Sequence, residues 1–436
     1  MLSHEDNSLM CLIGPTTSMG FAFRRYWIPA LQSDELPEGH PDPVHIELLG
    51  EHFVAFRDGD GKIGVLDENC CHRGASLLLG RIEGCGIRCI YHGWKFSIDG
   101  TVLDTPNVQD PKFKTRVRAR AYPVREAGGL IWVYLGQAGT TPAFPDWPWM
   151  HLAQKHRINA SATINCNYVQ VLEGLVDSSH LNLLHDSGMK SATASKLSFA
   201  ERVAGMQGDA SPRIEAEETE FGFHYAALRK INREVGPTTV ARVAAFIVPC
   251  FVANPNGDLS FAVVPVNDYR TRFYHIWWNP DRAIGEEPLR SEQLRFVGLD
   301  EETMDGYGMT QAACDRNDRP RRENRYLQNR QLMREHKHFT GLPNFTQEDT
   351  AVAVSAGAMR DRSKENLSTA DVAIGRLYRV LLKCAKKVQE GGDPIGIDPP
   401  IDVSHVVGID ANLADGQRWQ SLVPGHTPIR ASDSQA

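Results

Sequence analysis

The sequence predicts an α+β protein, in which a small all-β unit precedes a larger domain that combines an antiparallel sheet with helices. Two observations indicate the all-β unit: apolar residues alternate with polar ones over residues 44–66, and again over residues 85–105. A third observation indicates the second domain. Strand-like segments fill much of residues 212–279, and a strongly amphipathic helix is predicted over Ala370–Val388.

The elements of the first unit are separated by residues that favour turns. Gly50-Glu51 and Asp58–Gly61 divide the first alternating run, and Asp99-Gly100 divides the second. Ala121–Leu135 is a further β-like run, and the Pro-rich stretch Thr140–Pro148 marks a boundary. The expected organisation is an N-terminal segment packing on the core (residues 1–40), an all-β domain (41–145) and a second domain (146–436).

The second domain begins with residues 163–185, whose apolar residues have helical spacing. After the strands of residues 212–279, the charged stretch 285–338 is predicted to be helical. The tail beyond Asp393 is rich in Pro, Gly and Asp, and we expect it to wrap the surface.

Composition excludes several classes of protein. The 436 residues carry a net charge of −7, which argues against a general affinity for nucleic acid. No apolar stretch is long enough to span a bilayer, and the first ten residues do not resemble a signal peptide, so a cytoplasmic location is expected. Nine cysteines, most of them isolated, do not suggest a disulfide framework.

Four of these cysteines crowd into residues 70–89, and two of the four belong to a ligand-like pattern. Cys70-x-His72 is followed after sixteen residues by Cys89-x-x-His92, so each short segment offers one thiolate and one imidazole. In a Rieske [2Fe–2S] cluster, two cysteines hold one iron and two histidines hold the other. The pattern therefore predicts such a cluster.

A structural zinc site is the alternative, since two cysteines and two histidines are also a zinc ligand set. Zinc fingers usually place both cysteines in one pair and both histidines in the other, whereas each pair is mixed here. Cys71 and Cys85 are left over, and only Cys70 gives the Cys-x-His spacing. We therefore interpret Cys71 as a thiol outside the ligand set.

A second group of ligand types lies at Glu173, Asp177, His180 and His185. On a helix the first three share one face, but His185 falls well round the helix from His180, so the helix must end or widen between the two histidines. Two histidines and a carboxylate form the facial triad of non-haem Fe(II) enzymes, which leaves positions open for O₂. The alternative is a polar helix face with two incidental histidines.

The third ligand of such a site is expected far downstream. Asp349 is the favoured candidate, and its neighbour Glu348 is the competitor. The alternative is that both acids only cap the segment that follows them.

These motifs together resemble those of the aromatic-ring-hydroxylating Rieske oxygenases. The opening Arg25–Ala30, the run Leu66–Cys70 and Arg360–Ser363 are similar to the phthalate dioxygenase branch. The resemblance implies a Rieske domain followed by a helix-grip-like catalytic domain with a mononuclear iron, in α subunits that assemble as a trimer or stacked hexamer. Two features depart from the family pattern: Cys71 stands where the family usually has proline, and residues 323–340 drift from the branch.

The resemblance also implies roles for single residues. Cys70, His72, Cys89 and His92 would hold the cluster, and His180, His185 and Asp349 the iron. Asp177 would link the two centres by accepting a hydrogen bond from His92 of the neighbouring subunit, and Glu173 would be a supporting acid.

The substrate implied by the resemblance is a small aromatic carboxylate, such as a phthalate or a substituted benzoate. An arginine suits such an anion, and Arg242 lies in an otherwise apolar strand-like run. The alternative is a structural ion pair. Arg213 and Arg229 are weaker candidates for the same role, and Ser179, beside His180, is a candidate pocket residue.

The expected activity is O₂- and NADH-dependent oxygenation, with electrons delivered by a separate flavin and iron–sulfur reductase, with or without a ferredoxin. Arg73 and Lys95 are candidate docking residues, whereas the charged stretch Arg316–Lys337 is better explained as a solvated face. Monooxygenation or O-demethylation would use the same metal ligands. A pure electron carrier would leave the second metal motif unexplained, and a zinc-stabilised binding protein would lack a visible iron–sulfur spectrum.

Overall fold

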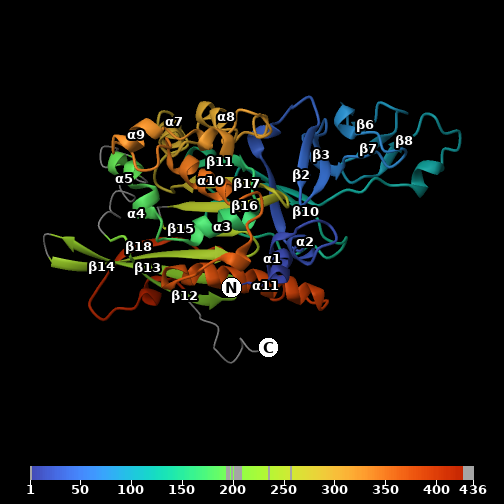
Figure 1. The fold of residues 1–436 in the computed structure, drawn as a ribbon. Helices are drawn as coiled ribbons and strands as arrows, with labels where there is room; N and C mark the ends of the chain where they lie inside the picture. The colour runs from blue at the N-terminus through green and yellow to red at the C-terminus, as the bar shows by residue number, and fades with distance from the viewer. Residues whose placement is uncertain are drawn as a thin grey trace.

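The computed structural model describes residues 2–192, 197, 200, 209–233, 236–255 and 258–425. Three small antiparallel sheets form the N-terminal region, and the C-terminal region is built on a large antiparallel sheet covered by helices (Figure 1). No helix in these ranges combines the length and the apolar character needed to cross a bilayer. The predicted α+β class is confirmed.

The predicted strands of the first unit are present, and they form two sheets in succession. The first comprises β2 (Val44–Leu48), β3 (Glu51–Arg57) and β4 (Ile63–Asp67). Leu49 and Gly50 form the β2–β3 turn, and their φ angles are both positive, 53° and 74°. Tight hairpin turns require such angles, which glycine adopts at little steric cost. The second comprises β5 (Arg81–Glu83), β6 (Gly86–Arg88), β7 (Lys95–Ser97) and β8 (Val102–Asp104).

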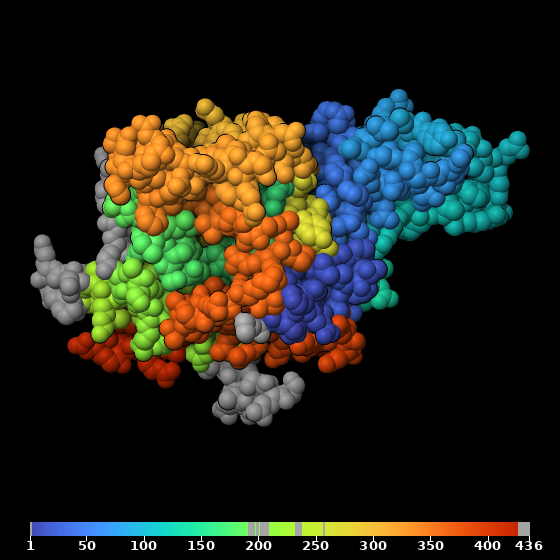
Figure 2. Space-filling view, viewed as in Figure 1, coloured from blue at the N-terminus to red at the C-terminus, as the bar shows by residue number. Residues whose placement is uncertain are grey.

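A third sheet ties the N-terminal segment to the end of this unit. In it β1 (Trp27–Gln32) pairs with β10 (Leu130–Tyr134), which pairs with β9 (Val124–Ala127). The short helices α1 (His4–Cys11) and α2 (Ser18–Phe23) pack against the late helix α11 (Val372–Gln389). The first forty residues therefore contact both regions of the chain. In the space-filling view the region that contains β5–β8 projects from the rest of the molecule (Figure 2).

The large sheet has eight strands in the order β11-β17-β16-β15-β14-β13-β12, with β18 pairing to β14. Their bounds are β11 Arg157–Ile164, β12 Arg213–Thr219, β13 Gly222–Arg233, β14 Gly236–Ile247, β15 Phe251–Asn254, β16 Leu259–Asn267, β17 Arg270–Trp278 and β18 Ile409–Leu413. The last strand was not predicted: residues 409–413 lie in the tail expected to wrap the surface, yet they extend this sheet.

Helices cover this sheet, and several of them begin or end at residues of the site described below. They are α3 (Tyr168–Val176), α4 (Leu181–Leu184), α5 (Asp186–Ala192), α7 (Leu289–Val297), α8 (Glu301–Gly306), α9 (Arg330–Arg334), α10 (Phe345–Ser355) and α11. α3 packs on β15, β16 and β17 and also contacts α10, while α11 packs on β12 and β13. The charged stretch 285–338 is partly helical, as three short helices joined by turns.

Candidate metal centres and active-site cavity

Three side chains that are far apart in the sequence converge at one point. His180 directly precedes α4, His185 directly follows it, and Asp349 lies on α10. Asp349 Oδ1 lies 3.2 Å from His185 Nε2 and 3.7 Å from His180 Nε2, and one ligand atom from each residue lies within 4.8 Å of the others. Two imidazoles and one carboxylate in this arrangement can hold a metal ion and leave other positions open.

Two further carboxylates orient the imidazoles by contacting the ring nitrogens that face away from Asp349. Glu348 Oε2 lies 2.8 Å from His185 Nδ1, and Asp177 Oδ2 lies 3.5 Å from His180 Nδ1. Each ring therefore directs Nε2 toward Asp349 and Nδ1 toward an acid, which fixes its tautomer. Of the two competing acids on α10, Asp349 faces both histidines, whereas Glu348 contacts the far side of one.

The electrostatics of this group suit a cation. Burial disfavours a charge on His185, but the carboxylates of Asp349 and Glu348 outweigh it and raise the pKa of His185 to about 10. Burial also opposes ionisation of Asp177, yet hydrogen bonds from His180 and Ser179 lower the pKa of this acid to about 2. A divalent cation would balance the negative charge that surrounds the imidazoles.

The predicted continuous helix through Asp177 is wrong at its C-terminal end. α3 stops at Val176, and Asp177 has extended backbone angles (φ −87°, ψ 110°). Its side chain accepts hydrogen bonds from the backbone and hydroxyl of Ser179 at 2.7 and 2.6 Å, which competes with helix formation. Asp177 and His180 therefore lie on a turn between two helices.

Glu173, expected beside the iron ligands, has other partners. Its carboxylate pairs with Arg362 and Arg360 and accepts a hydrogen bond from the Tyr378 hydroxyl. Glu173 and Arg362 are both almost fully buried. This acid ties α3 to the segment before α11, and the hydrogen bonds and ion pairs that it forms in the described part of the chain do not include either histidine of the triad.

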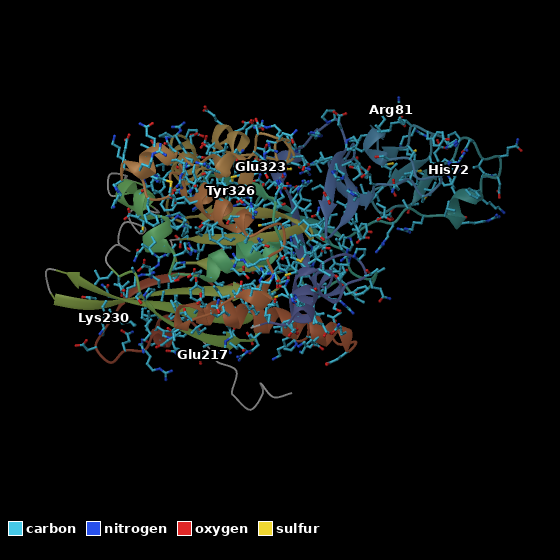
Figure 3. All side chains as sticks on the ribbon, viewed as in Figure 1. His72, Arg81, Glu217, Lys230, Glu323 and Tyr326 are labelled. Atoms are coloured by element: carbon cyan, nitrogen blue, oxygen red, sulfur yellow. The ribbon has the colours of Figure 1, made fainter. Side chains whose placement is uncertain are left out.

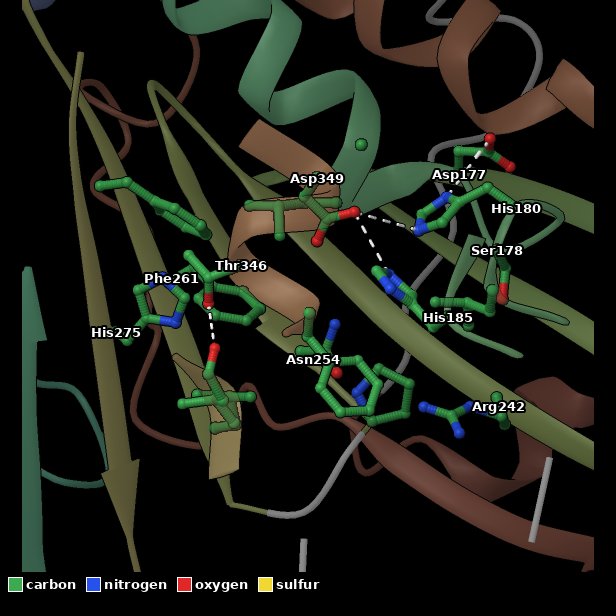
Figure 4. Close-up of a pocket in the computed structure, with 18 of the residues that line it drawn as sticks. Asp177, Ser178, His180, His185, Arg242, Asn254, Phe261, His275, Thr346 and Asp349 are labelled. Carbon is green, nitrogen blue, oxygen red and sulfur yellow. Dashed lines mark hydrogen bonds and ion pairs between the residues drawn. The ribbon is translucent and has the colours of Figure 1, made fainter. Parts of the chain in front are cut away.

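A cavity adjoins the triad and encloses about 840 Å³ of empty space, part of it open to solvent. Aromatic and aliphatic side chains form most of its wall, among them Phe261, Phe273, Trp277 and Phe345. In the view of Figure 4, Arg242 and His275 approach from opposite sides and the triad stands on a third. An apolar cavity with a few convergent polar groups is typical of a small-molecule site.

Arg242 has properties of both predicted roles. It lies on β14, is 3% exposed and lines the cavity, but its Nη1 also lies 3.8 Å from Asp410 Oδ2 on β18. The weaker candidates lie elsewhere: Arg213 is exposed and pairs with Glu215, and Arg229 donates to the Ser178 carbonyl at 2.6 Å.

Of the two neighbouring serines, Ser178 lines the cavity, whereas Ser179 bonds to Asp177 as described. The expectation that Ser179 contacts the substrate does not fit this placement, because the turn after α3 directs its hydroxyl to the carboxylate.

Two residues in or beside the cavity, His275 and Asp410, were not predicted from the sequence. His275 lies on β17 with Phe273 and Trp277, and all three line the cavity. Its burial lowers its pKa to about 3, so it is neutral at physiological pH. The alternation Phe273-x-His275-x-Trp277 was a usable signal, because alternate residues of a strand share a face.

The second candidate centre is built from two equivalent loops. The Gly74 amide donates to the Cys70 carbonyl at 2.9 Å, and the Gly93 amide to the Cys89 carbonyl at 3.0 Å. Both glycines have positive φ, of 71° and 78°, which L-residues rarely adopt. Each loop thus closes with the same backbone hydrogen bond and contains one cysteine and one histidine.

The two cysteines of the loops are buried, whereas the two histidines lie near the surface. Cys70 and Cys89 are buried, and burial raises the pKa of the Cys70 thiol to about 12, with a further contribution from Cys89. The rings of His72 and His92 lie 4.5 Å apart near the surface, and His72 stacks on Trp94 at 4.4 Å. Two inner thiols and two outer imidazoles fit a Rieske cluster. Cys71 and Cys85 are exposed.

Comparison with known proteins agrees with both centres. The family described as "Rieske [2Fe-2S] domain" matches residues 26–123, and the one described as "LigXa C-terminal domain like" matches residues 133–431. The chain therefore belongs to the Rieske non-haem iron oxygenases, as an oxygenase subunit of the phthalate dioxygenase-like branch, and its cofactors are a [2Fe–2S] cluster and a mononuclear iron.

Several particular proteins are similar to this one. The phthalate 4,5-dioxygenase oxygenase subunit of Pseudomonas putida is 34% identical over 439 residues, 96% of this chain and 94% of that protein. The 3-chlorobenzoate-3,4-dioxygenase oxygenase subunit of Comamonas testosteroni is 34% identical, covering 90% and 91%. The tert-butanol monooxygenase / tert-amyl alcohol desaturase oxygenase subunit of Aquincola tertiaricarbonis is 41% identical over 301 residues, 65% and 63%.

Among solved structures, NdmA of Pseudomonas putida CBB5, bound to caffeine, has the same fold. Its TM-score is 0.58 at 16% identity, with 92% of this chain and all of that chain covered.

Proposed function

We propose that this chain oxygenates a small aromatic carboxylate, such as a phthalate or a substituted benzoate, at an iron held by His180, His185 and Asp349. In the same proposal Cys70, His72, Cys89 and His92 hold the cluster. The convergence of the three iron ligands beside a mostly apolar cavity that contains Arg242 is the observation that carries it. The names of the two relatives that align over nine tenths of the chain support the substrate class.

The protein's role in this reaction is to bind, orient and exclude water. When bound by His180, His185 and Asp349, iron would supply the chemistry that activates O₂. The apolar wall would orient the aromatic ring of the substrate and exclude water. The Arg242 guanidinium would pair with the substrate carboxylate through two parallel hydrogen bonds. His275, neutral at physiological pH, would offer a hydrogen bond at the other side without adding charge.

Asp177 would connect the two kinds of centre between subunits of a homotrimer or stacked hexamer. His72 lies on the projecting end of the molecule (Figure 3), whereas α4 lies at the other end of the ribbon in Figure 1. One chain's cluster thus stands far from its own triad, which favours electron delivery from a neighbouring copy. Asp177 contacts His180, and its side chain is 21% exposed, so a partner's imidazole can reach it.

Electrons would come from NADH through a separate flavin and iron–sulfur reductase, with or without a ferredoxin. The loops around the cluster expose Ile90 (63%) and Tyr91 (55%), and the Arg73 guanidinium lies 5.7 Å from the Tyr91 ring centre. An exposed apolar patch with a basic neighbour is suited to a transient partner.

A second candidate function is monooxygenation or O-demethylation of a less charged substrate. Asp410 lies near Arg242 and reduces the positive charge that faces the cavity. The similarity to the tert-butanol monooxygenase oxygenase subunit, whose substrate is neutral, points the same way.

A single-turnover experiment separates the two candidates. The protein is reduced without oxygen, mixed with O₂ and one compound, and followed by cluster absorbance and product mass. Benzoates, phthalates and methoxybenzoates are compared with their amides and with tert-butanol. Faster cluster reoxidation and an oxygenated product with acids only would support the first proposal. The same result with neutral compounds only would favour the second, and no acceleration by any compound would contradict both.

A further inference from the structure

A second group of metal-ligand types lies on the Rieske domain, apart from both iron centres. Among the described residues, two groups of three side chains place ligand atoms within 4.8 Å of one another: the iron triad, and His45, His52 and Glu68. His45 is on β2, His52 on β3, and Glu68 directly follows β4. Two adjacent strands of one small sheet and the residue after the third strand thus contribute one ligand each.

The distances in this group resemble those of the iron triad. His45 Nε2 lies 3.0 Å from His52 Nδ1 and 3.6 Å from Glu68 Oε2, compared with 3.2 and 3.7 Å in the triad. Zinc bonds of about 2.0–2.1 Å in a tetrahedron place neighbouring ligands about 3.3 Å apart. Both distances from His45 Nε2 therefore lie within a few tenths of an ångström of this spacing, and all three atoms lie within 4.8 Å of one another.

The register of the sheet explains why the two histidines meet. β2 and β3 pair with His45 opposite Val54 and Glu47 opposite His52, so the histidines are diagonal neighbours on one face. Their rings stack at 5.2 Å. Two imidazoles held on adjacent strands form a chelate whose spacing is set by the backbone.

Glu68 is also held in place. Its Oε1 accepts a hydrogen bond from Ser76 Oγ at 2.6 Å, which leaves Oε2 toward His45. Asn69 and Ser76 form an isolated β-bridge at the base of the first cluster loop. The carboxylate is therefore anchored to the loop that presents Cys70 and His72, and it is only partly exposed, while His52 is open to solvent.

We propose that His45, His52 and Glu68 bind a divalent transition-metal ion, with zinc as the best match for two imidazoles and one carboxylate. Water completes the coordination on the open side of His52. The ion joins the three strands of the sheet to the base of the first cluster loop. This site is independent of the catalytic iron and of the substrate proposed above.

The test is the zinc content of the iron-loaded, cluster-containing protein after equilibrium dialysis against limiting Zn²⁺, measured by mass spectrometry. H52A and H45A are compared with wild type, and all three keep the triad, so any exchange at the iron site is common to them. Wild type is expected to hold one zinc per subunit more than either variant. H151A is the matched control, because His151 is an exposed histidine that pairs with Asp146 and belongs to neither group of three ligand types found among the described residues. It is expected to bind zinc as wild type does.

A second measurement uses the same iron-loaded protein and a different readout. Cu²⁺ added to the oxidised wild-type protein is expected to give a paramagnetic resonance spectrum with coupling to two imidazole nitrogens, and E68Q is expected to alter it while the visible cluster spectrum stays unchanged. Equal zinc content in wild type and H52A, or a copper spectrum without nitrogen coupling, would overturn the proposal. The three side chains would then be a hydrogen-bonded cluster only.

Discussion

Glu348 and Asp349, adjacent on α10, contact opposite nitrogens of the same His185 ring, at 2.8 Å from Nδ1 and 3.2 Å from Nε2. The side chains of adjacent residues on a helix point about 100° apart. Two neighbouring acids on α10 can therefore contact the same imidazole ring at different nitrogens. This relationship gives the two acids different roles and makes them separable by mutation.

D349A is expected to abolish mononuclear iron binding, because it removes a proposed ligand. E348Q is expected to weaken iron binding by about 10- to 100-fold, as loss of an orienting partner of a ligand usually does. Iron content against added Fe(II), with the cluster spectrum as the control for folding, checks both. If E348Q lost iron as completely as D349A, the division of roles would be wrong.

D177N is expected to slow substrate-triggered reoxidation of the cluster by about 10- to 100-fold, compared with wild type at equal iron and cluster content. The carboxylate, its pKa near 2, is ionised at all working pH values, and an amide cannot supply that charge. S179A is the matched control, since it removes one hydrogen bond to Asp177 but keeps the acid. Equal rates in D177N and wild type would argue against the proposed link between subunits.

R242Q is expected to lower kcat/KM for an aromatic acid by about 10- to 100-fold, the value of a lost charged hydrogen bond. Activity on the matching amide should change little. R213Q, which alters an exposed arginine of the neighbouring region of the sheet, is expected to behave as wild type. A loss that is equal for acid and amide would mean that Arg242 acts through Asp410 in holding the cavity together.

His275 is expected to make stability depend on pH. Its pKa is about 3 in the folded protein and about 6.5 when exposed, so below pH 6.5 the unfolded chain binds a proton that the folded chain does not. Stability therefore falls as the pH drops from 7 to 5, by about 2 kcal/mol from this residue. Unfolding midpoints of wild type and H275Q at both pH values check this, and an equal fall in both would contradict it.

E173Q is expected to destabilise the fold by roughly 3–5 kcal/mol, because it leaves the buried Arg362 guanidinium without its carboxylate. Iron bound per folded molecule should not change. Thermal unfolding and iron content measured on the same samples separate this structural role from the supporting role at the iron that the family resemblance implies for Glu173. Loss of iron without loss of stability would favour the role at the iron instead.

The sequence was most informative where ligands are close together in the chain. The two Cys/His loops were predicted from spacing alone, since each loop is a local structure of five residues. Asp349 could only be favoured over its neighbour Glu348, because nothing local to residues 345–351 identifies which histidines that helix will meet. The end of α3 was predicted wrongly because its apolar spacing continues beyond Val176. The helix stops there because the Asp177 carboxylate accepts a hydrogen bond from the Ser179 amide.

The strand 409–413 was missed for a different reason. Ile409, Ala411 and Leu413 do alternate with polar residues, but five residues in a Pro- and Gly-rich tail are weak evidence, and their register against β14 is set by tertiary packing. The same limit applied to Asp410, whose contact with Arg242 exists only because of that pairing.

This pairing separates two properties of the enzyme along the chain. The proposed ligands of the iron and of the cluster all precede position 350, whereas Asp410, which lies 3.8 Å from Arg242, belongs to the short strand β18. A single change of charge in that strand can therefore move the preference between anionic and neutral substrates while both redox centres stay intact.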